Sequence, residues 1–294
     1  MNRAFQTIGL AGATALFVML IGCPVATAGP FTGKNGPIAV VKSRGNTDYL
    51  GVYSKKRKFR TLYKSVYSDP YDSDQLTDLS FSPSGTRIAF SHGWRPSRLS
   101  IANVRTGKGR YVPTGRIDAY LPSWGSNGRI TFLGSTTMSN KRRGTYSVRE
   151  GGGGRHRLFK AQTLAASVDQ HWFVTAGGDQ AASHHLDLLN DKGNRVRSIV
   201  RDRRYQFSNP AFSANGRWIA YQRNKSDTGG QAGSLFVVRR DGTHRRRLTT
   251  GNRDGAPAFS PDGRWIVFIR QHRGGSLNSN VAVLANEDDP SSVR

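Results

Sequence analysis

A phrase of 12 residues recurs along the chain and restricts its fold more than any other feature. It reads FSPSGTRIAFSH from Phe81, FSANGRWIAYQR from Phe212 and FSPDGRWIVFIR from Phe259. Weaker copies extend the series, whose first apolar residues are spaced 43 to 50 residues apart: Phe31, Phe81, Trp124, Val168, Phe212 and Phe259. A repeat of this period indicates one supersecondary unit that is copied and stacked.

Each repeat predicts four short antiparallel strands. The phrase supplies a turn rich in Pro, Asp, Asn and Gly and then an apolar strand. A second segment, such as GSLFVVRRDGTHRRRLTTG, is typical of a strand, a polar turn and a shorter strand. Glu occurs only at Glu150 and Glu287, and no window shows a sustained helical period. Six such units predict an all-β fold, a six-bladed β-propeller of four-stranded blades.

The repetition has a physical reason, because a single blade cannot bury both of its apolar faces alone. Blades placed around an axis bury each other's faces. The sixth unit ends in NSNVAVLANEDDPSSVR, which offers only a weak final strand. The ring is therefore expected to close there or through a strand from near the N-terminus, such as Gly29–Gly33.

The first 28 residues are typical of a secretory signal peptide. Arg3 is their only charge, an apolar core runs from about Ile8 to Ile21, and Ala26-Thr27-Ala28 provides small residues for cleavage after Ala28. The remaining residues, 29–294, are expected to form one propeller domain. LIGC, at residues 20–23, also matches a bacterial lipoprotein box, in which Cys23 would carry a lipid. Both alternatives export the protein.

Composition limits which interactions can stabilise the fold and indicates which partners the chain attracts. Cys23 is the only cysteine, so the residues after the leader contain neither a disulfide nor a thiolate metal site. The formal net charge is +25, which favours contact with polyanions without specifying a fold.

The unit φ-S-P-D-G-x-W-I-φ-F, where φ is apolar, resembles the TolB-type propeller repeat of bacterial envelope proteins. The resemblance covers the chain from about Phe31 to its C-terminus and implies a propeller fold. TolB places an α/β domain ahead of its propeller, whereas about eight residues separate the leader from the first unit here. The resemblance therefore carries no role in the Tol–Pal machinery to this chain.

Residue patterns for catalysis are absent from the sequence. No Gly-x-Ser-x-Gly nucleophile motif occurs, and the seven histidines show no metal-ligand spacing. We predict no catalytic, cofactor or metal residue. A propeller that carries its own active site, as some sugar lyases of similar architecture do, remains an alternative.

Two loops stand out as candidate contact sites. The segment YKSVYSDPYDSDQLTD joins the first two units and concentrates aromatic and acidic side chains in a basic chain. It is either a cation site, a partner-contact patch or a solvated loop. Its candidate residues are Tyr67, Asp69, Tyr71, Asp72 and Asp74. In SHGWRPS, Trp94 and Arg95 fall outside the apolar positions of the repeat, so Trp94 is the best single anchor for a partner. The other tryptophans occupy strand positions and are expected to pack between blades.

Basic side chains cluster at one place in the repeat, the turn between the third and fourth strands and the start of the fourth. Because the fourth strand is the outer edge of a blade, these clusters predict a basic rim on one face: Lys55, Lys56, Arg57, Lys58, Arg157, Arg197, Arg239, Arg240, Arg245, Arg246 and Arg247. Such charges either blunt exposed edge strands or bind a polyanion.

The sequence therefore predicts an exported, non-enzymatic, monomeric propeller that binds protein or peptide partners in the bacterial envelope or outside the cell. The alternative is a surface protein that binds anionic polysaccharide or lipid head groups through the basic rim. Specific recognition of nucleic acid is not expected, because few aromatic residues interleave the basic clusters.

Overall fold

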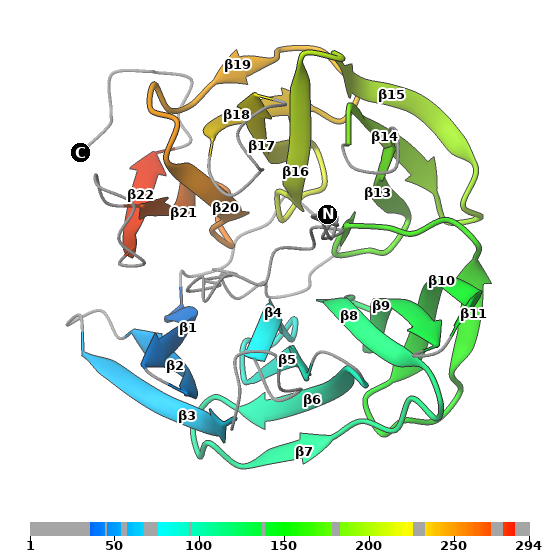
Figure 1. Ribbon diagram of the computed structural model, residues 1–294, viewed down its shortest axis with the longest axis vertical. Helices are drawn as coiled ribbons and strands as arrows, with labels where there is room; N and C mark the ends of the chain where they lie inside the picture. Colours follow the sequence, from blue (N-terminus) through cyan, green and yellow to red (C-terminus); the bar gives the residue numbers. More distant parts are fainter. Residues whose placement is uncertain are drawn as a thin grey trace, which may run out of the picture.

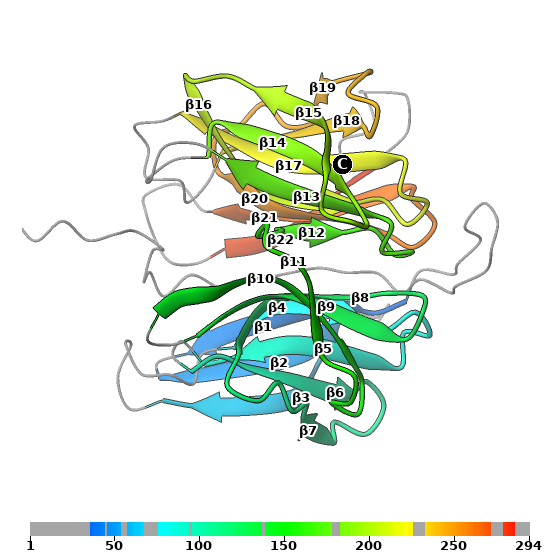
Figure 2. The ribbon, with the colours of Figure 1, turned by 90° about the vertical axis from the view of Figure 1, so that its right-hand side faces the viewer.

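The computed structural model of the chain describes residues 36–44, 46–53, 58–67, 76–93, 96–136, 139–177, 183–225, 233–271 and 279–285. Within these ranges the regular structure is β-strand, in 22 strands that form six antiparallel sheets. The sheets are arranged around a common axis (Figure 1). Their strands run through the thickness of the disc, so the connections lie on its two faces (Figure 2). The prediction of an all-β propeller is confirmed. None of the described residues belongs to a helix that could span a membrane.

Four sheets contain four strands in chain order, from the axis outward. The second sheet contains β4 (Leu76–Phe81), β5 (Arg87–His92), β6 (Arg98–Asn103) and β7 (Gly109–Tyr111). The third contains β8 (Asp118–Trp124), β9 (Arg129–Thr136), β10 (Ser139–Arg149) and β11 (His156–Phe159). The fourth contains β12 (Ala165–Ala166), β13 (Trp172–Gly177), β14 (His185–Asn190) and β15 (Arg195–Arg201). The fifth contains β16 (Tyr205–Phe212), β17 (Trp218–Lys225), β18 (Ser234–Arg239) and β19 (Arg246–Arg247).

The first and last sheets have three described strands each, which differs from the predicted four. The first contains β1 (Ile38–Arg44), β2 (Thr47–Tyr53) and β3 (Phe59–Val66). The sixth contains β20 (Asp254–Phe259), β21 (Trp265–Gln271) and β22 (Ser279–Ala285). In repeat register β1 is a second strand, so the described part of the first sheet lacks an inner strand and that of the sixth lacks an outer one. The predicted closing strand, residues 29–33, lies outside the described residues.

The repeated phrase is the turn that leaves each inner strand. Phe81, Trp124, Phe212 and Phe259 are the last residues of their inner strands. Gly125 follows Trp124, whereas a serine follows the inner strand in four other copies. This serine accepts a hydrogen bond from the amide five residues later, as in Trp218 N to Ser213 Oγ at 2.9 Å and the matching bonds of Ser82, Ser167 and Ser260. Its glycine adopts a positive φ, for example 66° at Gly85 and 72° at Gly263. The phrase recurs because every sheet needs this turn.

The fourth repeat corrects one predicted position. The inner strand β12 ends at Ala166, and Val168 lies two residues later in the turn. Ser167 accepts the turn's hydrogen bond from the Trp172 amide, and Gln170 takes the glycine position with a φ of 58°. The pattern misplaced this anchor because alanine stands where the other repeats have a large apolar residue.

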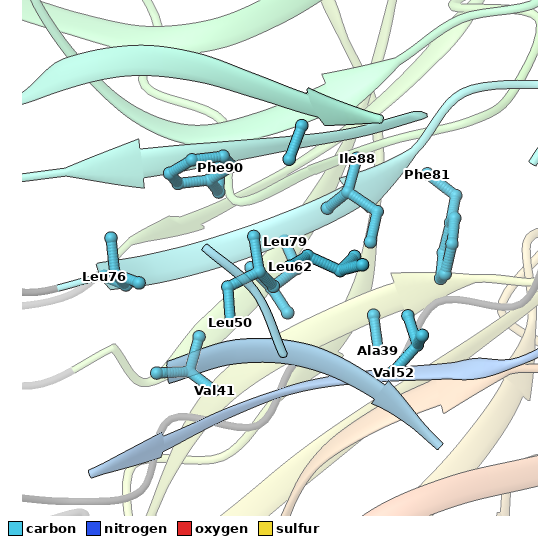
Figure 3. Close-up of a cluster of buried hydrophobic side chains, with 11 residues drawn as sticks. Ala39, Val41, Leu50, Val52, Leu62, Leu76, Leu79, Phe81, Ile88 and Phe90 are labelled. Atoms are coloured by element: carbon cyan, nitrogen blue, oxygen red, sulfur yellow. The ribbon is translucent and has the colours of Figure 1, made fainter. Parts of the chain in front are cut away.

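Hydrophobic clusters hold neighbouring sheets together. The cluster between the first two sheets joins Leu50 of β2 to Leu79 and Phe90 of the second sheet (Figure 3). A smaller cluster joins Val40 of β1 to Val267 of β21. The ring therefore closes by side-chain packing between the first and last sheets.

Four inner strands contain a β-bulge at the same place. The bulged residues Asp78, Leu121, Asn209 and Ala256 have φ between 48° and 52°, and the strand register shifts beside each. Proline follows the last three of them. A bulge leaves a residue without a ladder hydrogen bond, so it accommodates proline, which has no amide hydrogen to donate.

The bulge at Asp78 makes stability depend on pH. Burial raises the pKa of this carboxyl above 3.8, although hydrogen bonds from Leu121 N and Thr77 Oγ1 act in the opposite direction. The folded state then holds a proton more tightly than the unfolded state. Unfolding free energy should therefore fall as pH rises from 3.8 through the raised pKa. We expect Asp78→Asn to remove this loss in thermal unfolding measured from roughly pH 3 to 8.

Asp202 provides the control of opposite sign. Its partner Arg204 lowers the pKa of Asp202 to about 2, so its contribution is present above 3.8 and disappears as pH falls through 2. Asp202→Asn should therefore lower the unfolding free energy by a constant amount above pH 3.8 and change the slope of the profile only between about 2 and 3.8. A profile of Asp78→Asn that superposes on that of the unmodified protein contradicts the prediction.

Candidate functional site

Many of the predicted contact residues lie outside the described part of the chain. These are the anchor pair Trp94 and Arg95, the acidic residues Asp69, Asp72 and Asp74 with Tyr71, the first basic cluster Lys55, Lys56 and Arg57, and Cys23. Tyr67 is described and is buried, with 3% of its surface exposed. Burial and the nearby Asp48 carboxylate raise the pKa of its hydroxyl. Its ring therefore offers little surface to a partner.

The described basic residues of the rim lie at the predicted turns between third and outer strands. Lys58, Arg157, Arg197, Arg239, Arg245 and Arg247 are exposed, whereas Arg240 and Arg246 are half-buried. Arg247 has a structural role, because its guanidinium donates to Thr249 O at 2.6 Å and Ser234 Oγ at 2.7 Å. Arg247 is therefore anchored within its own sheet.

A cleft of about 510 Å³ opens between the fourth and fifth sheets, on the face that carries these turns. Its walls come from β13, β14 and β15 on one side and from two turns of the fifth sheet on the other. Four arginines, two tryptophans and one carboxylate contribute to its lining: Trp172, Leu188, Val196, Arg197, Asn215, Arg217, Trp218, Arg239, Arg240 and Asp241. We call it the Arg–Trp cleft.

Aromatic rings and backbone carbonyls position the arginines of this cleft. The Arg240 guanidinium lies 4.4 Å from the ring centre of Trp172 and donates to Gly216 O at 3.2 Å. Arg239 lies 5.2 Å from the ring centre of Trp218. Arg197 donates to the backbone carbonyl of Asp241. These contacts orient the guanidinium groups without neutralising their charge.

Asp241 is the carboxylate among the lining residues. Hydrogen bonds from the hydroxyl and amide of Thr243 lower its pKa, and the guanidinium groups of Arg239 and Arg197 lower it further. It therefore stays ionised at neutral pH and offsets one of the four positive charges. The lining retains a net positive charge, which favours an anionic ligand.

The arrangement suits the binding of an anion. No group of three or more metal-ligating side chains occurs among the described residues. The cleft presents guanidinium donors, apolar surface and the carboxylate of Asp241. It can therefore orient and hold a carboxylate, sulfate or phosphate group.

Sequence reasoning missed part of this site. Trp172 and Trp218 were expected to pack between blades, yet both line the cleft, and Arg217 had not been singled out. Trp124 is buried as expected, whereas Trp265 is 42% exposed, so its expected packing is wrong. The available signal was positional, because Trp172 and Trp218 each open a second strand directly after the repeated turn.

No protein-family profile and no curated protein sequence matches the chain. Solved structures do share its fold. A protein described as TolB from Agrobacterium tumefaciens aligns with a TM-score of 0.63 and 19% identity, over 79% of this chain and 82% of that one. TolB from Acinetobacter baumannii aligns with a TM-score of 0.65 and 15% identity, over 87% of this chain and 62% of that one.

An oligogalacturonate lyase in complex with manganese also aligns, with a TM-score of 0.51 and 12% identity, over 91% of this chain and 79% of that one. Identities this low establish a shared fold and no shared activity. The protein is a β-propeller of antiparallel sheets. Its propeller is of the TolB-like type.

Proposed function

We propose that the protein is a non-enzymatic binding module that holds an acidic polysaccharide on the face carrying the basic rim. The Arg–Trp cleft is the observation that supports this most, because it combines four guanidinium groups with apolar ring surface and one carboxylate. Arginine forks match carboxylates, and the C–H faces of sugars pack on aromatic rings. Exposed rim arginines on several sheets can follow a long polymer around the disc.

The proposal places the protein outside the cytoplasm. Residues 1–28 act as the leader, with cleavage after Ala28 or lipidation at Cys23, and residues 29–294 form the exported domain. The TolB-like propeller fold supports a location in the bacterial envelope. The mature protein is proposed to act as a monomer.

Binding to a polyuronate tests the proposal. We expect the protein without residues 1–28 to bind polygalacturonate at low salt. The binding should disappear as added salt screens the charges of the basic rim. Arg157→Ala with Arg245→Ala should weaken binding about two- to five-fold per arginine, because both side chains are exposed. Surface-immobilised polymer provides the measurement. The matched control is the same polymer with its carboxylates methyl-esterified, and equal binding of charged and esterified polymer overturns the proposal.

A protein or peptide partner is the second candidate, and the TolB-like fold favours it. Its contact would use the connection between β5 and β6, to which Trp94 belongs in the sequence. A defined envelope protein that is retained at high salt by the unmodified chain and lost with Trp94→Ala would support this candidate over the polysaccharide. Binding that follows the rim arginines and fails at moderate salt would support the polysaccharide.

Enzymatic activity has a direct test. The likeness to an oligogalacturonate lyase concerns the fold. We expect polygalacturonate to remain intact during incubation with the protein, with and without manganese. Formation of unsaturated uronate products, followed by ultraviolet absorbance, would contradict a non-enzymatic role.

A further inference from the structure

The interface between the second and third sheets contains a closed cluster of charges. Glu150 lies between two arginines of the second sheet. Its carboxylate accepts hydrogen bonds from Arg87 Nη1 at 2.6 and 2.5 Å and from Arg110 Nη2 at 2.8 Å. One carboxylate thus joins two guanidinium groups across the interface. We call these three residues the carboxylate clamp.

Strand register places the Arg–Trp cleft at the equivalent interface two sheets further on. Arg87 pairs with the last residue of β6, and Trp172 pairs with the last residue of β14. Arg110 pairs with Ile101 and Arg197 with Leu188, each two positions before that last residue. Trp172 and Arg197 therefore occupy the places of Arg87 and Arg110.

At the position equivalent to the third member of the clamp, the Arg–Trp cleft has a residue of opposite charge. Glu150 directly follows the last residue of β10, and Arg240 directly follows the last residue of β18. The Arg–Trp cleft thus keeps the guanidinium of Arg197 but has a second guanidinium where the clamp has its carboxylate. In the clamp a carboxylate lies between two guanidinium groups, so an interface of this kind accommodates a carboxylate beside its arginines.

Residues of the cleft do not replace the missing acid. Asp241 is the nearest candidate, yet its carboxylate accepts from Thr243 N at 2.9 Å and Thr243 Oγ1 at 2.6 Å. Arg197 reaches the backbone carbonyl of Asp241. These hydrogen bonds hold the Asp241 carboxylate against Thr243 within the turn. The cleft keeps a volume of about 510 Å³.

We propose that the Arg–Trp cleft is a subsite for one uronic acid residue, whose carboxylate binds between Arg197 and Arg240 and replaces the acid that Glu150 supplies in the clamp. The sugar ring packs against the apolar wall of Trp172, Leu188 and Val196. This subsite rests on the proposed function and adds the unit of the polymer that is recognised. Two guanidinium forks specify a planar carboxylate more strongly than a diffuse charge does.

Arg240→Glu tests the subsite because it returns a carboxylate to the place that Glu150 occupies in the clamp. The new carboxylate is expected to bind Arg197, so the variant should fold. Its affinity for tri-galacturonate should fall about 10- to 100-fold, since a charged hydrogen-bond partner is lost and a repelling charge is added. Isothermal titration calorimetry measures the affinity, and quenching of tryptophan fluorescence reports whether the trimer reaches Trp172 and Trp218.

Two further variants control for charge and packing. Arg116 is exposed in the connection between β7 and β8, on the opposite face, so Arg116→Glu changes net charge equally and should leave trimer affinity within about two-fold. Arg240→Gln keeps most of the side chain and should lose affinity without repulsion.

The outcomes separate the subsite from the broader proposal. Loss of trimer binding in Arg240→Glu with retention in Arg116→Glu supports the subsite. Equal trimer affinity in the unmodified protein and Arg240→Glu overturns the subsite, and the proposed function survives if long polygalacturonate still binds. Failure of both trimer and polymer to bind the unmodified protein overturns both.

Discussion

Phe90→Ala is expected to remove about 3–5 kcal/mol from the free energy of unfolding. Phe90 is 0% exposed in the cluster between the first two sheets. Its ring lies 5.2 Å from that of Tyr63, which comes from the first sheet. Truncation would leave a cavity at an interface on which the three-stranded first sheet depends. This is a large part of the roughly 5–15 kcal/mol that stabilises a typical domain.

Urea unfolding followed by tryptophan fluorescence measures the loss. Phe90→Leu keeps most of the volume and should cost less than about 1.5 kcal/mol. Tyr111→Ala serves as the exposed control, because this aromatic residue is 45% exposed. If Phe90→Ala lowers the free energy of unfolding no more than Tyr111→Ala does, the packing between the first two sheets does not stabilise the propeller.

Much of the fold could be predicted from the sequence because its turn chemistry is local. The serine, the glycine and the apolar strand start lie within one short phrase, so Phe81, Phe212 and Phe259 mark the ends of inner strands correctly. The repeat pattern misplaced the end of the fourth inner strand at Val168, because β12 has only two residues and ends at Ala166. For the first and last sheets three strands are described, and the predicted fourth strands fall outside the described residues.

The candidate site was less accessible to prediction, because its residues come from two repeats and five separate segments. The location of Arg197, Arg239 and Arg240 followed from counting along one repeat. Their meeting with Trp172 depends on how neighbouring sheets pack, which the sequence does not display. Trp265 illustrates the limit, since it shares the position of Trp218 but pairs with Ala285, whereas Trp218 pairs with Arg239.

Comparing equivalent interfaces shows how one scaffold can acquire a binding site. The propeller needs each interface to be packed, and the clamp achieves this with an internal ion pair. Where Arg240 replaces the acid, stacking on Trp172 at 4.4 Å maintains the packing and leaves positive charge available. The closed interface and the binding cleft thus differ at two of the three positions, where Trp172 replaces Arg87 and Arg240 replaces Glu150.

Glu150→Arg is therefore expected to convert the clamp into a second anion site. The substitution places a third guanidinium beside Arg87 and Arg110 and removes their carboxylate. Because these side chains are partly exposed, the loss of stability should be moderate, about 1–3 kcal/mol. Tri-galacturonate should recover part of it, since a ligand that binds only the folded state stabilises that state. Thermal unfolding with increasing trimer measures both effects.

The exchange variant Glu150→Arg with Arg240→Glu provides the strictest control, because it leaves the net charge unchanged. It should contain an anion site beside Arg87 and Arg110 and a carboxylate that faces Arg197 at the other interface, so it should bind one trimer. Titration of the single variant Glu150→Arg should show two binding events, and the unmodified protein should show one. If the exchange variant binds no trimer while remaining folded, local shape beyond the charge pattern determines the site, and the equivalence between clamp and cleft is wrong.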